Sequence, residues 1–271
     1  MEMGCGGELE ILIEPLSLAR ATAFADSLAQ CLDARVGAQL ATLFALDGQV
    51  IAPQRMVWSA QQLLFDGSSD TSIRDVIADA CAAHRTRGAT TQQLASPHGT
   101  LDVLIESVEP PHALVVIGSS ATARALLPLS TALGWQTTLV DHDPLQLQAP
   151  DLPPGLRTLC TEPERLHQSL PLDGHTAVVV MTHNLERDIA WLAALRDAPV
   201  AYVGSLGSRE RVSRMRRASE LAGLRLHAPA GLDIGSETPE EIALAVAAEI
   251  MAVINRRSGG PLRDNDGAIH G

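Results

Sequence analysis

Four short apolar runs after residue 111 constrain the fold of this chain more than any other feature. They span residues 113–117, 137–140, 177–181 and 199–203. Helical patterns separate most of these runs, over residues 121–133, 185–196 and 208–221. Near-continuous apolar strands that alternate with helices are typical of a parallel sheet covered on both faces. We therefore predict an α/β domain with a parallel sheet over residues 112–258.

The last helix of this domain has a strongly specified start. Thr238 is a good N-cap residue, Pro239 suits the first helical position, and Glu241 completes a capping box. We expect the helix to run from Pro239 to about Arg256, and a flexible tail to follow over residues 259–271.

The first 111 residues follow a different pattern, which predicts a smaller α+β region. Alternating apolar residues favour strands and helical spacing favours helices; strands are expected at 9–13, 40–46 and 101–108, and helices at 18–32 and 71–85. Asp47-Gly48 is typical of a hairpin turn. The Pro110-Pro111 pair interrupts both helix and strand pairing, so we place the domain boundary there.

Composition excludes several classes of protein. A net charge of -12 with 3% aromatic residues argues against nucleic-acid binding, which needs basic patches and stacking rings. All 20 basic residues are Arg, so the chain forms no lysine Schiff base, P-loop or standard kinase site. The four cysteines form no Cys-x-x-Cys pair, and no apolar stretch reaches the roughly 18 residues that span a bilayer. Without a signal peptide pattern, a cytoplasmic protein is expected.

The first strand of the parallel sheet ends in a turn that suits phosphate binding. Gly118, Ser119 and Ser120 lead into a helix, and Asp141 ends the next strand, where an acid holds a ribose hydroxyl in a Rossmann unit. Ser120 stands where the fingerprint has its second glycine. This turn is therefore open to three interpretations: an NAD(P)-binding oxidoreductase, a purely structural turn, or a hydrolase elbow with Ser120 as nucleophile.

Polar residues follow the third apolar run. Thr182 and His183 lie at the end of a parallel strand, where such sheets place their ligands. The alternative is a helix N-cap by Thr182 or Asn184, with His183 as a bystander. Asp141-His142-Asp143 is a further candidate for metal binding, but it lacks a third spaced ligand.

The strongest anion-binding signal follows the fourth run. Gly204, Gly207 and Ser208 belong to a loop that opens a helix, and five arginines lie between residues 209 and 217. A glycine-rich loop at a helix N-terminus flanked by guanidinium groups favours phosphate binding. We assign Arg209 to an anion and most of the other arginines to solvent or a partner.

Two glycine-containing segments complete the candidate site. Gly231 and Asp233 belong to a loop that leads into the capped last helix, near the same crevice. Cys5 lies among glycines near the N-terminus, which suits a sulfur nucleophile or a soft metal ligand. The alternative for Cys5 is a free thiol on an unstructured end.

Several of these segments together resemble the XdhC/CoxI family of xanthine dehydrogenase accessory proteins. The similarity lies in Cys5–Leu16, Met181–His183, Tyr202–Arg209, Ala228–Gly235, Thr238–Ala243 and Ala248–Ile250. The resemblance implies a Rossmann-like domain that binds the molybdenum cofactor (molybdopterin) and protects it during sulfuration. It implies a carrier rather than a catalyst, with a molybdenum hydroxylase apoenzyme and a cysteine desulfurase as partners, and leaves homo-oligomer formation open. The expected cofactor-binding residues are Cys5 (also a molybdenum contact), Gly118, Ser119, Ser120, Asp141, Thr182, His183, Gly204, Gly207, Ser208, Arg209, Gly231 and Asp233.

The chain differs from the family pattern at three places. It starts at the Gly-Cys-Gly-Gly segment, without the preceding Gly-Ser-x-Pro-Arg and Gly-Gly-Cys-Leu-Glu motifs. Its turn reads Gly118-Ser-Ser-Ala121 instead of Gly-Ala-Gly-His, and Asp141-His-Asp143 replaces Asp-x-Arg. A shortened or divergent relative with weaker cofactor binding fits the sequence as well.

Overall fold

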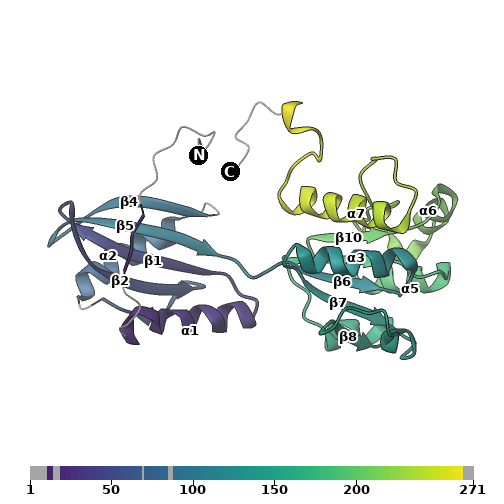
Figure 1. Cartoon of the computed structure of the whole chain (residues 1–271), viewed down its shortest axis with the longest axis horizontal. Coiled ribbons are helices and arrows are strands. Elements are labelled where there is room, and N and C mark those ends of the chain that lie inside the picture. Colours follow the sequence, from purple (N-terminus) through teal and green to yellow (C-terminus); the bar gives the residue numbers. More distant parts are fainter. Residues whose placement is uncertain (1–10, 15–18, 69, 85–87, 265–271) are drawn as a thin grey trace. The chain divides into compact units, whose positions relative to one another are not determined.

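The computed structural model describes residues 11–14, 19–68, 70–84 and 88–264. The chain divides into two compact units, Met1–Pro110 and Pro111–Gly271. Each unit has its own sheet (Figure 1).

The first unit is an antiparallel sheet with one helix on each face. Its strand order is β3-β2-β1-β5-β4, with β1 at Ala38–Leu46, β2 at Gln49–Ser59, β3 at Gln62–Asp66, β4 at Ala89–Ser96 and β5 at Gly99–Val108. Helix α1 (Ala19–Asp33) packs on the face that carries Leu40 and Val57. Helix α2 (Thr71–Ala83) packs on the face that carries Leu43 and Met56.

The sequence predicted part of this unit correctly. The Asp47-Gly48 hairpin is confirmed, because β1 and β2 pair on either side of it and both residues have positive φ, 49° and 74°. The prediction of a strand at 9–13 is wrong for residues 11–13, the part of it that the structure describes. Residues 11–14 form no strand, and Ile13 is 87% exposed. Alternation indicates which face of a strand is apolar, but a strand also needs a neighbour for its backbone hydrogen bonds.

The second unit is a five-stranded parallel sheet with helices on both faces. The strand order is β10-β9-β6-β7-β8, with β6 at Ala113–Ile117, β7 at Gln136–Asp141, β8 at Arg157–Cys160, β9 at Thr176–Val180 and β10 at Tyr202–Ser205. The helices are α3 (Ala121–Ala132), α4 (Leu166–Ser169), α5 (Leu185–Ala194), α6 (Arg209–Arg216) and α7 (Pro239–Ile254). Single 3-10 turns lie at Gln146–Gln148, Pro163–Arg165, Ser219–Leu221 and Leu262–Asp264. The predicted parallel α/β fold is confirmed.

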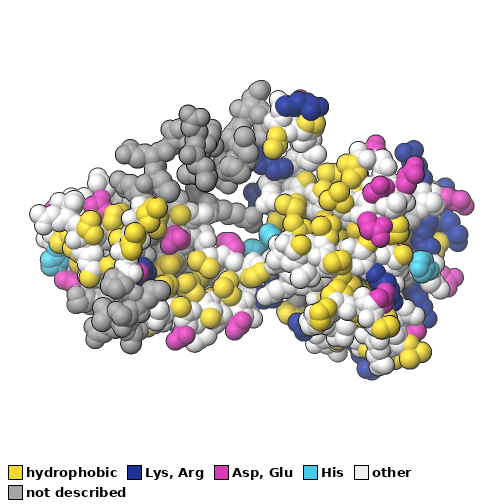
Figure 2. Space-filling view, in the orientation of Figure 1, with side chains coloured by type: hydrophobic (Ala, Val, Ile, Leu, Met, Phe, Trp, Pro, Cys, Tyr) yellow, Lys and Arg dark blue, Asp and Glu magenta, His cyan; other side chains and the backbone are white. Residues whose placement is uncertain are grey.

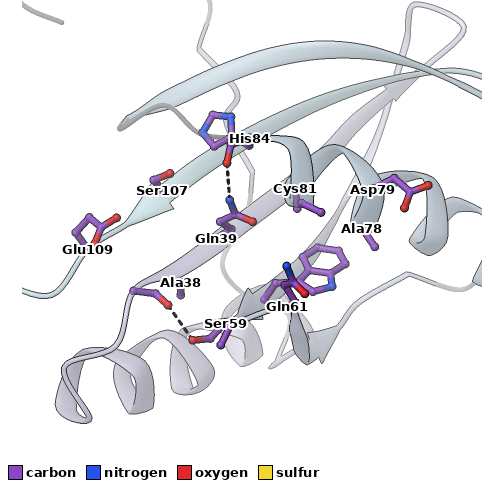
Figure 3. A pocket seen from close by; sticks show the side chains of 14 residues that line it. Ala38, Gln39, Ser59, Gln61, Ala78, Asp79, Cys81, His84, Ser107 and Glu109 are labelled. Carbon is purple, nitrogen blue, oxygen red and sulfur yellow. Dashed lines mark hydrogen bonds between the residues drawn. The ribbon is translucent and has the colours of Figure 1, made fainter.

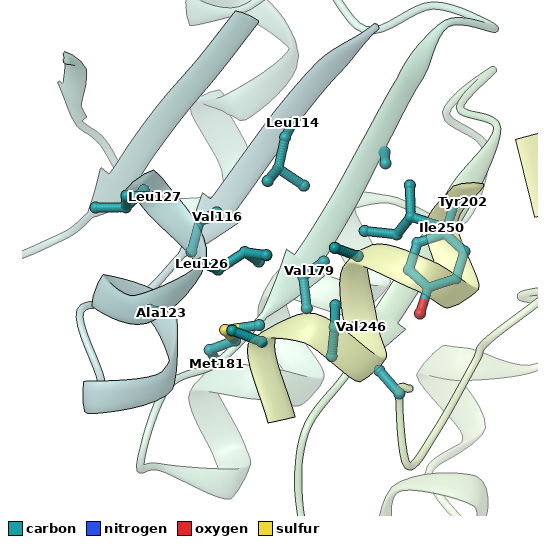
Figure 4. Packing of buried hydrophobic residues seen from close by; sticks show 14 of the residues in the cluster. Leu114, Val116, Ala123, Leu126, Leu127, Val179, Met181, Tyr202, Val246 and Ile250 are labelled. Carbon is teal, nitrogen blue, oxygen red and sulfur yellow. The ribbon is translucent and has the colours of Figure 1, made fainter. Parts of the chain in front are cut away.

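Alternate residues of the strands fill two separate cores. In β6, Leu114 and Val116 face α3 and α7, as Figure 4 shows. Val115 and Ile117 face the opposite core, which α4, α5 and α6 cover. This two-sided burial explains why the strands have near-continuous apolar sequences.

The predicted start of α7 is confirmed in detail. Thr238 is the N-cap, its side chain accepts from the backbone N–H of Glu241, and the Glu241 carboxylate accepts from the backbone of Thr238 in return. Pro239 occupies the first turn.

Two expectations for this unit differ from the structure. The strand expected at 199–203 lies at Tyr202–Ser205 instead. Pro199 has no N–H to donate to a neighbouring strand, and β10 begins three residues after it. The helix expected at 208–221 ends at Arg216, where the backbone N–H groups of Arg217 and Ala218 bond to carbonyls three residues earlier and tighten the last turn. Strand β8 was not predicted, since it is only four residues long and mostly exposed.

Among the described residues, no helix has both the length and the apolar character needed to cross a lipid bilayer.

Candidate functional site

A crevice forms where the connections from two neighbouring strands diverge. β6 lies between β7 and β9, and its helix α3 covers one face of the sheet, whereas α5, which follows β9, covers the other. Ligands of doubly wound sheets bind at such a switch point, outside the carboxyl ends of the strands. A cavity of about 430 Å³ lies here. Its lining residues are Gly118, Ser119, Ser120, Asp141, His142, Asp143, Gln146, Met181, Thr182, His183, Asn184 and Arg187.

Gly118 permits the close approach of two loops at the crevice. Its φ is +93°, and an added Cβ would lie 3.0 Å from the backbone of Met181 and from the Thr182 methyl group. Its N–H donates to the carbonyl of Val140 at 2.8 Å. Glycine is therefore required here for backbone conformation and for space.

Asp141 is held in place at the end of β7. Its carboxylate accepts from the backbone N–H of Asp143 at 3.0 Å and from the Ser119 hydroxyl at 3.1 Å. His142 Nδ1 lies 2.9 Å from Asp141 Oδ1, the oxygen that also accepts from the Asp143 N–H. Among the described residues, no three His, Cys, Asp or Glu side chains form a group suited to a metal ion. The arrangement presents a preorganised hydrogen-bond acceptor at the crevice.

Two helices begin at the crevice, each with its own N-cap. Ser120 caps α3 by accepting from the N–H of Ala123 at 3.2 Å. Asn184 caps α5 by accepting from two backbone N–H groups, at 2.9 and 3.1 Å. The capping interpretation of the Thr182–Asn184 segment is therefore confirmed for Asn184. The side chain of His183 is exposed and lines the cavity.

Arg187 is a crevice residue that sequence reasoning missed. It lies in the first turn of α5, three residues after the Asn184 N-cap, and lines the same cavity as His183. Its spacing from the N-cap was the available signal. A residue three positions after the N-cap lies in the first turn of the helix, and this helix begins at the crevice. Arg187 brings a cationic side chain to this cavity.

Arg211 ties helix α6 to the crevice through a buried ion pair. Its Nη2 lies 2.5 Å from Oδ2 of Asp188, whose side chain is fully buried in α5. The guanidinium also donates to the carbonyls of Thr182 at 3.3 Å and His183 at 3.4 Å, and the Thr182 hydroxyl donates to the Asp188 carboxylate. Arg211 belongs to the group of arginines that we expected to face mostly solvent or a partner. In the structure this side chain positions the crevice wall instead.

Burial and this network act in opposite directions on Asp188. Burial raises the pKa of the Asp188 carboxyl, while the Thr182 hydroxyl and the Arg211 guanidinium lower it. The net shift is upward, because a carboxylate loses its hydration when no surface is exposed to water.

The remaining predicted residues lie outside the switch-point cavity. Gly207 and Asp233 line a second cavity of about 470 Å³, next to the start of α7. Ser208 is the N-cap of α6, and Arg209 is exposed; neither lines either cavity. Gly204 is buried in β10 beside the Tyr202 ring. Cys5 lies outside the described residues.

Gly231 has a structural role in the described chain. Its φ is +116°, and its N–H donates at 2.8 Å to Glu249 Oε2, the same oxygen that accepts from the Tyr202 hydroxyl at 2.6 Å. His227 stacks on Tyr202 with ring centroids 4.5 Å apart. Burial, and then the Glu249 carboxylate, raise the pKa of Tyr202. This cluster anchors the 228–235 loop to α7.

A further cavity, of about 680 Å³, lies within the first unit, where β1, β2 and β5 meet the end of α2 (Figure 3). Gln39 donates to the carbonyl of His84 at 3.3 Å across it. Cys81 lines it, but burial raises the pKa of this thiol to about 12. The thiolate is the reactive form of cysteine, so Cys81 is not an activated nucleophile at neutral pH.

The fold and the crevice define the class of this protein. A parallel sheet with the order β10-β9-β6-β7-β8, a glycine turn after the central strand and a polar cavity at the switch point are the features of a Rossmann-type domain. Residues 114–250 match the sequence model of the XdhC Rossmann domain family. This match covers half of the chain, and the chain belongs to that family.

Three curated proteins are similar to part of this chain. YqeB of Escherichia coli (strain K12), described as uncharacterized, is 34% identical over 54% of this chain and 28% of its own length. A probable xanthine dehydrogenase subunit of Bacillus subtilis (strain 168) is 29% identical over 62% of this chain and 51% of its own length. The molybdenum cofactor insertion chaperone PaoD of E. coli (strain K12) is 28% identical over 52% of this chain and 39% of its own length. The chain spans about half or less of the length of these relatives.

A solved structure is similar to this chain across both units. A crystal structure described as a xanthine dehydrogenase from Bacillus halodurans superposes with a TM-score of 0.69. The match covers 89% of this chain and 66% of the other at 20% identity, which supports the fold.

Proposed function

We propose that this protein binds the molybdenum cofactor at the switch-point crevice and assists its insertion into a xanthine dehydrogenase-type molybdenum hydroxylase. The observation that carries the proposal is the polar cavity at the ends of β6, β7 and β9 in a domain of the XdhC family. The names of two relatives support it, one a molybdenum cofactor insertion chaperone and the other a probable xanthine dehydrogenase subunit.

The crevice has the size and donors that such a cargo needs. A volume of about 430 Å³ lies in the range of small-molecule sites. Binding of the cofactor's phosphate is favoured by Arg187, His183 and the N-termini of α3 and α5. Asp141 offers a fixed acceptor for N–H or hydroxyl groups on its ring system.

In this proposal the protein's own residues bind and orient the cargo and catalyse no step. Gly118 allows the backbone to approach the ligand closely, and Arg211 holds the Thr182–His183 wall in position. Two finer steps come from the family resemblance alone: sulfuration of the bound cofactor with a cysteine desulfurase as partner, and contact of Cys5 with molybdenum.

The test uses the purified protein and freshly released molybdenum cofactor. After gel filtration, molybdenum and oxidised-pterin fluorescence are measured in the protein peak, and about one equivalent is expected. Arg187→Ala should weaken binding about tenfold or more, since a charged hydrogen bond contributes roughly 1.5–3 kcal/mol. The matched control, Arg209→Ala, removes the same charge from an exposed position outside the cavity.

Two outcomes assign the phosphate site, and a third contradicts the proposal. Loss of cofactor binding only in Arg187→Ala supports the crevice as the phosphate site. Loss of cofactor binding only in Arg209→Ala supports the loop at Gly204–Ser208 instead. A wild-type peak without molybdenum contradicts the proposed function.

The alternative from the sequence, an NAD(P)-binding oxidoreductase, uses the same turn and the same acid. Calorimetric titration with NAD⁺ and NADP⁺ separates the two functions. Micromolar binding of either nucleotide that Asp141→Asn abolishes, together with an empty cofactor peak, would favour the oxidoreductase.

A further inference from the structure

Helix α6 has a basic outer face with no acidic partner in the described chain. Val212 and Met215 are buried on its inner side. Arg209, Arg214 and Arg217, which we call the α6 basic face, are exposed. Figure 2 shows basic side chains gathered over this part of the second unit.

The charge of this face is not balanced from within the described residues. None of the guanidinium groups of the α6 basic face forms an ion pair or hydrogen bond there, although the chain has 32 acidic residues. Glu210 is the single acidic residue of α6. Arg214 lies in the last turn of α6 and Arg217 is its C-cap residue, so two like charges lie close together at this end of the helix. An opposite charge from another molecule would relieve this repulsion.

The other side of the same helix reaches the crevice. Arg211 bonds to Asp188 and to the carbonyls of Thr182 and His183, so α6 is joined to the wall of the cavity. A protein docked on the α6 basic face therefore contacts the element that holds this wall.

We propose that the α6 basic face docks an acidic surface of a partner protein, the one that exchanges the crevice ligand. This inference rests on the proposed function for the identity of that partner. Guanidinium groups match carboxylates in a planar, two-bond geometry. A net charge of -12 opposes binding to a long polyanion or an anionic lipid surface, because either would also lie close to acidic parts of the protein surface, whereas a docked protein can contact the α6 basic face alone.

The test measures binding of a fluorescein-labelled decaglutamate peptide by anisotropy at low and at physiological salt. The wild-type protein is expected to bind it, more weakly at higher salt. The double variant Arg214→Glu/Arg217→Glu should lose about tenfold or more in affinity. The matched control, Arg157→Glu/Arg165→Glu, changes the net charge equally at exposed positions outside α6 and should stay within about twofold.

Four outcomes overturn the proposal. They are no peptide binding by the wild-type protein, equal losses in both double variants, preferential binding of a DNA duplex or of phosphatidylserine vesicles through the same arginines, and a wild-type dimer that Arg214→Glu/Arg217→Glu dissociates. The last would assign the face to a second copy of the chain.

Cofactor binding is measured separately on the same variants and should not change. Peptide binding without cofactor binding contradicts the proposed function alone. Cofactor binding without peptide binding contradicts the docking face alone.

Discussion

At the scale of single residues, the crevice depends on the backbone of Gly118. This residue has φ +93° and leaves no room for a Cβ beside Met181. The two flanking capping residues, Ser120 and Asn184, bind backbone N–H groups with their side chains and so orient α3 and α5. Short polar side chains and one glycine therefore set where a ligand meets the sheet.

Substitution of Gly118 tests this requirement. Gly118→Ala should lower the free energy of unfolding by about 1–3 kcal/mol, because alanine is strained at this φ and contacts the Met181 backbone. Gly174→Ala is the control, since the nearest atom to an added Cβ there is 4.0 Å away, at Pro199 O. Urea denaturation measures both variants. Equal stability of the two variants would show that Gly118 is not required.

At the scale of elements, a single buried pair connects α5 with α6. Asp188 is fully buried and Arg211 is its ion-pair partner. Since the same guanidinium binds the Thr182 and His183 carbonyls, the pair joins two helices to the loop that ends β9.

Removal of Arg211 should therefore be costly. Arg211→Met leaves the buried Asp188 carboxylate without its charged partner and with only the Thr182 hydroxyl donating to it, so the free energy of unfolding at pH 7 should fall by about 3–5 kcal/mol. Arg209→Met, on the same helix but exposed, should change it by no more than about 0.5 kcal/mol. Similar losses in both variants would contradict the role of the pair.

The effect should also depend on pH in a defined direction. Burial raises the pKa of Asp188 above its ordinary 3.8, so the folded state holds this proton more tightly than the unfolded state. The stabilisation from the bound proton is present at low pH and is lost as the pH rises through the folded pKa. Arg211 lowers this pKa, so the folded-state pKa of Asp188 is higher in Arg211→Met than in the wild type. The variant therefore goes on losing stability up to a higher pH than the wild type. The deficit of Arg211→Met should therefore shrink as the pH falls, which denaturation at several pH values measures.

At the scale of the whole molecule, each unit has its own hydrophobic cores. The two clusters around the parallel sheet contain only residues after Pro111. The two clusters of the antiparallel sheet contain only residues before Pro110. Each unit thus buries its apolar surface within itself.

We propose on this basis that the units are separate folding domains. A fragment of residues 111–271 should unfold cooperatively on its own, because both of its cores are complete. A fragment that starts at Gly118 lacks β6, the central strand, and should not fold. Circular dichroism during thermal unfolding compares the two. A broad, non-cooperative transition of the longer fragment would contradict the proposed domain boundary.

The elements that the sequence predicted best are those with strong local signals. Thr238, Pro239 and Glu241 define the start of α7, and Asp47-Gly48 defines a hairpin, because caps and turns depend on residues close in the chain. β8 was missed because a four-residue, mostly exposed strand has little apolar periodicity. Residues 11–14 show the opposite error, an alternating pattern without a strand.

The parallel α/β class, most of the helices and strands, and the likeness to the XdhC family could all be predicted from the amino-acid sequence, because periodicity, caps and motifs are local properties of the chain. The strand order, and with it the set of loops that meet at the switch point, could not be predicted in this way. Folding brings Arg187 and His142 to the cavity of Gly118 and Asp141, and it turns Arg211 inward to Asp188. Side chains distant in sequence meet only after strands pair side by side, and periodicity along a strand carries no information about its lateral neighbour.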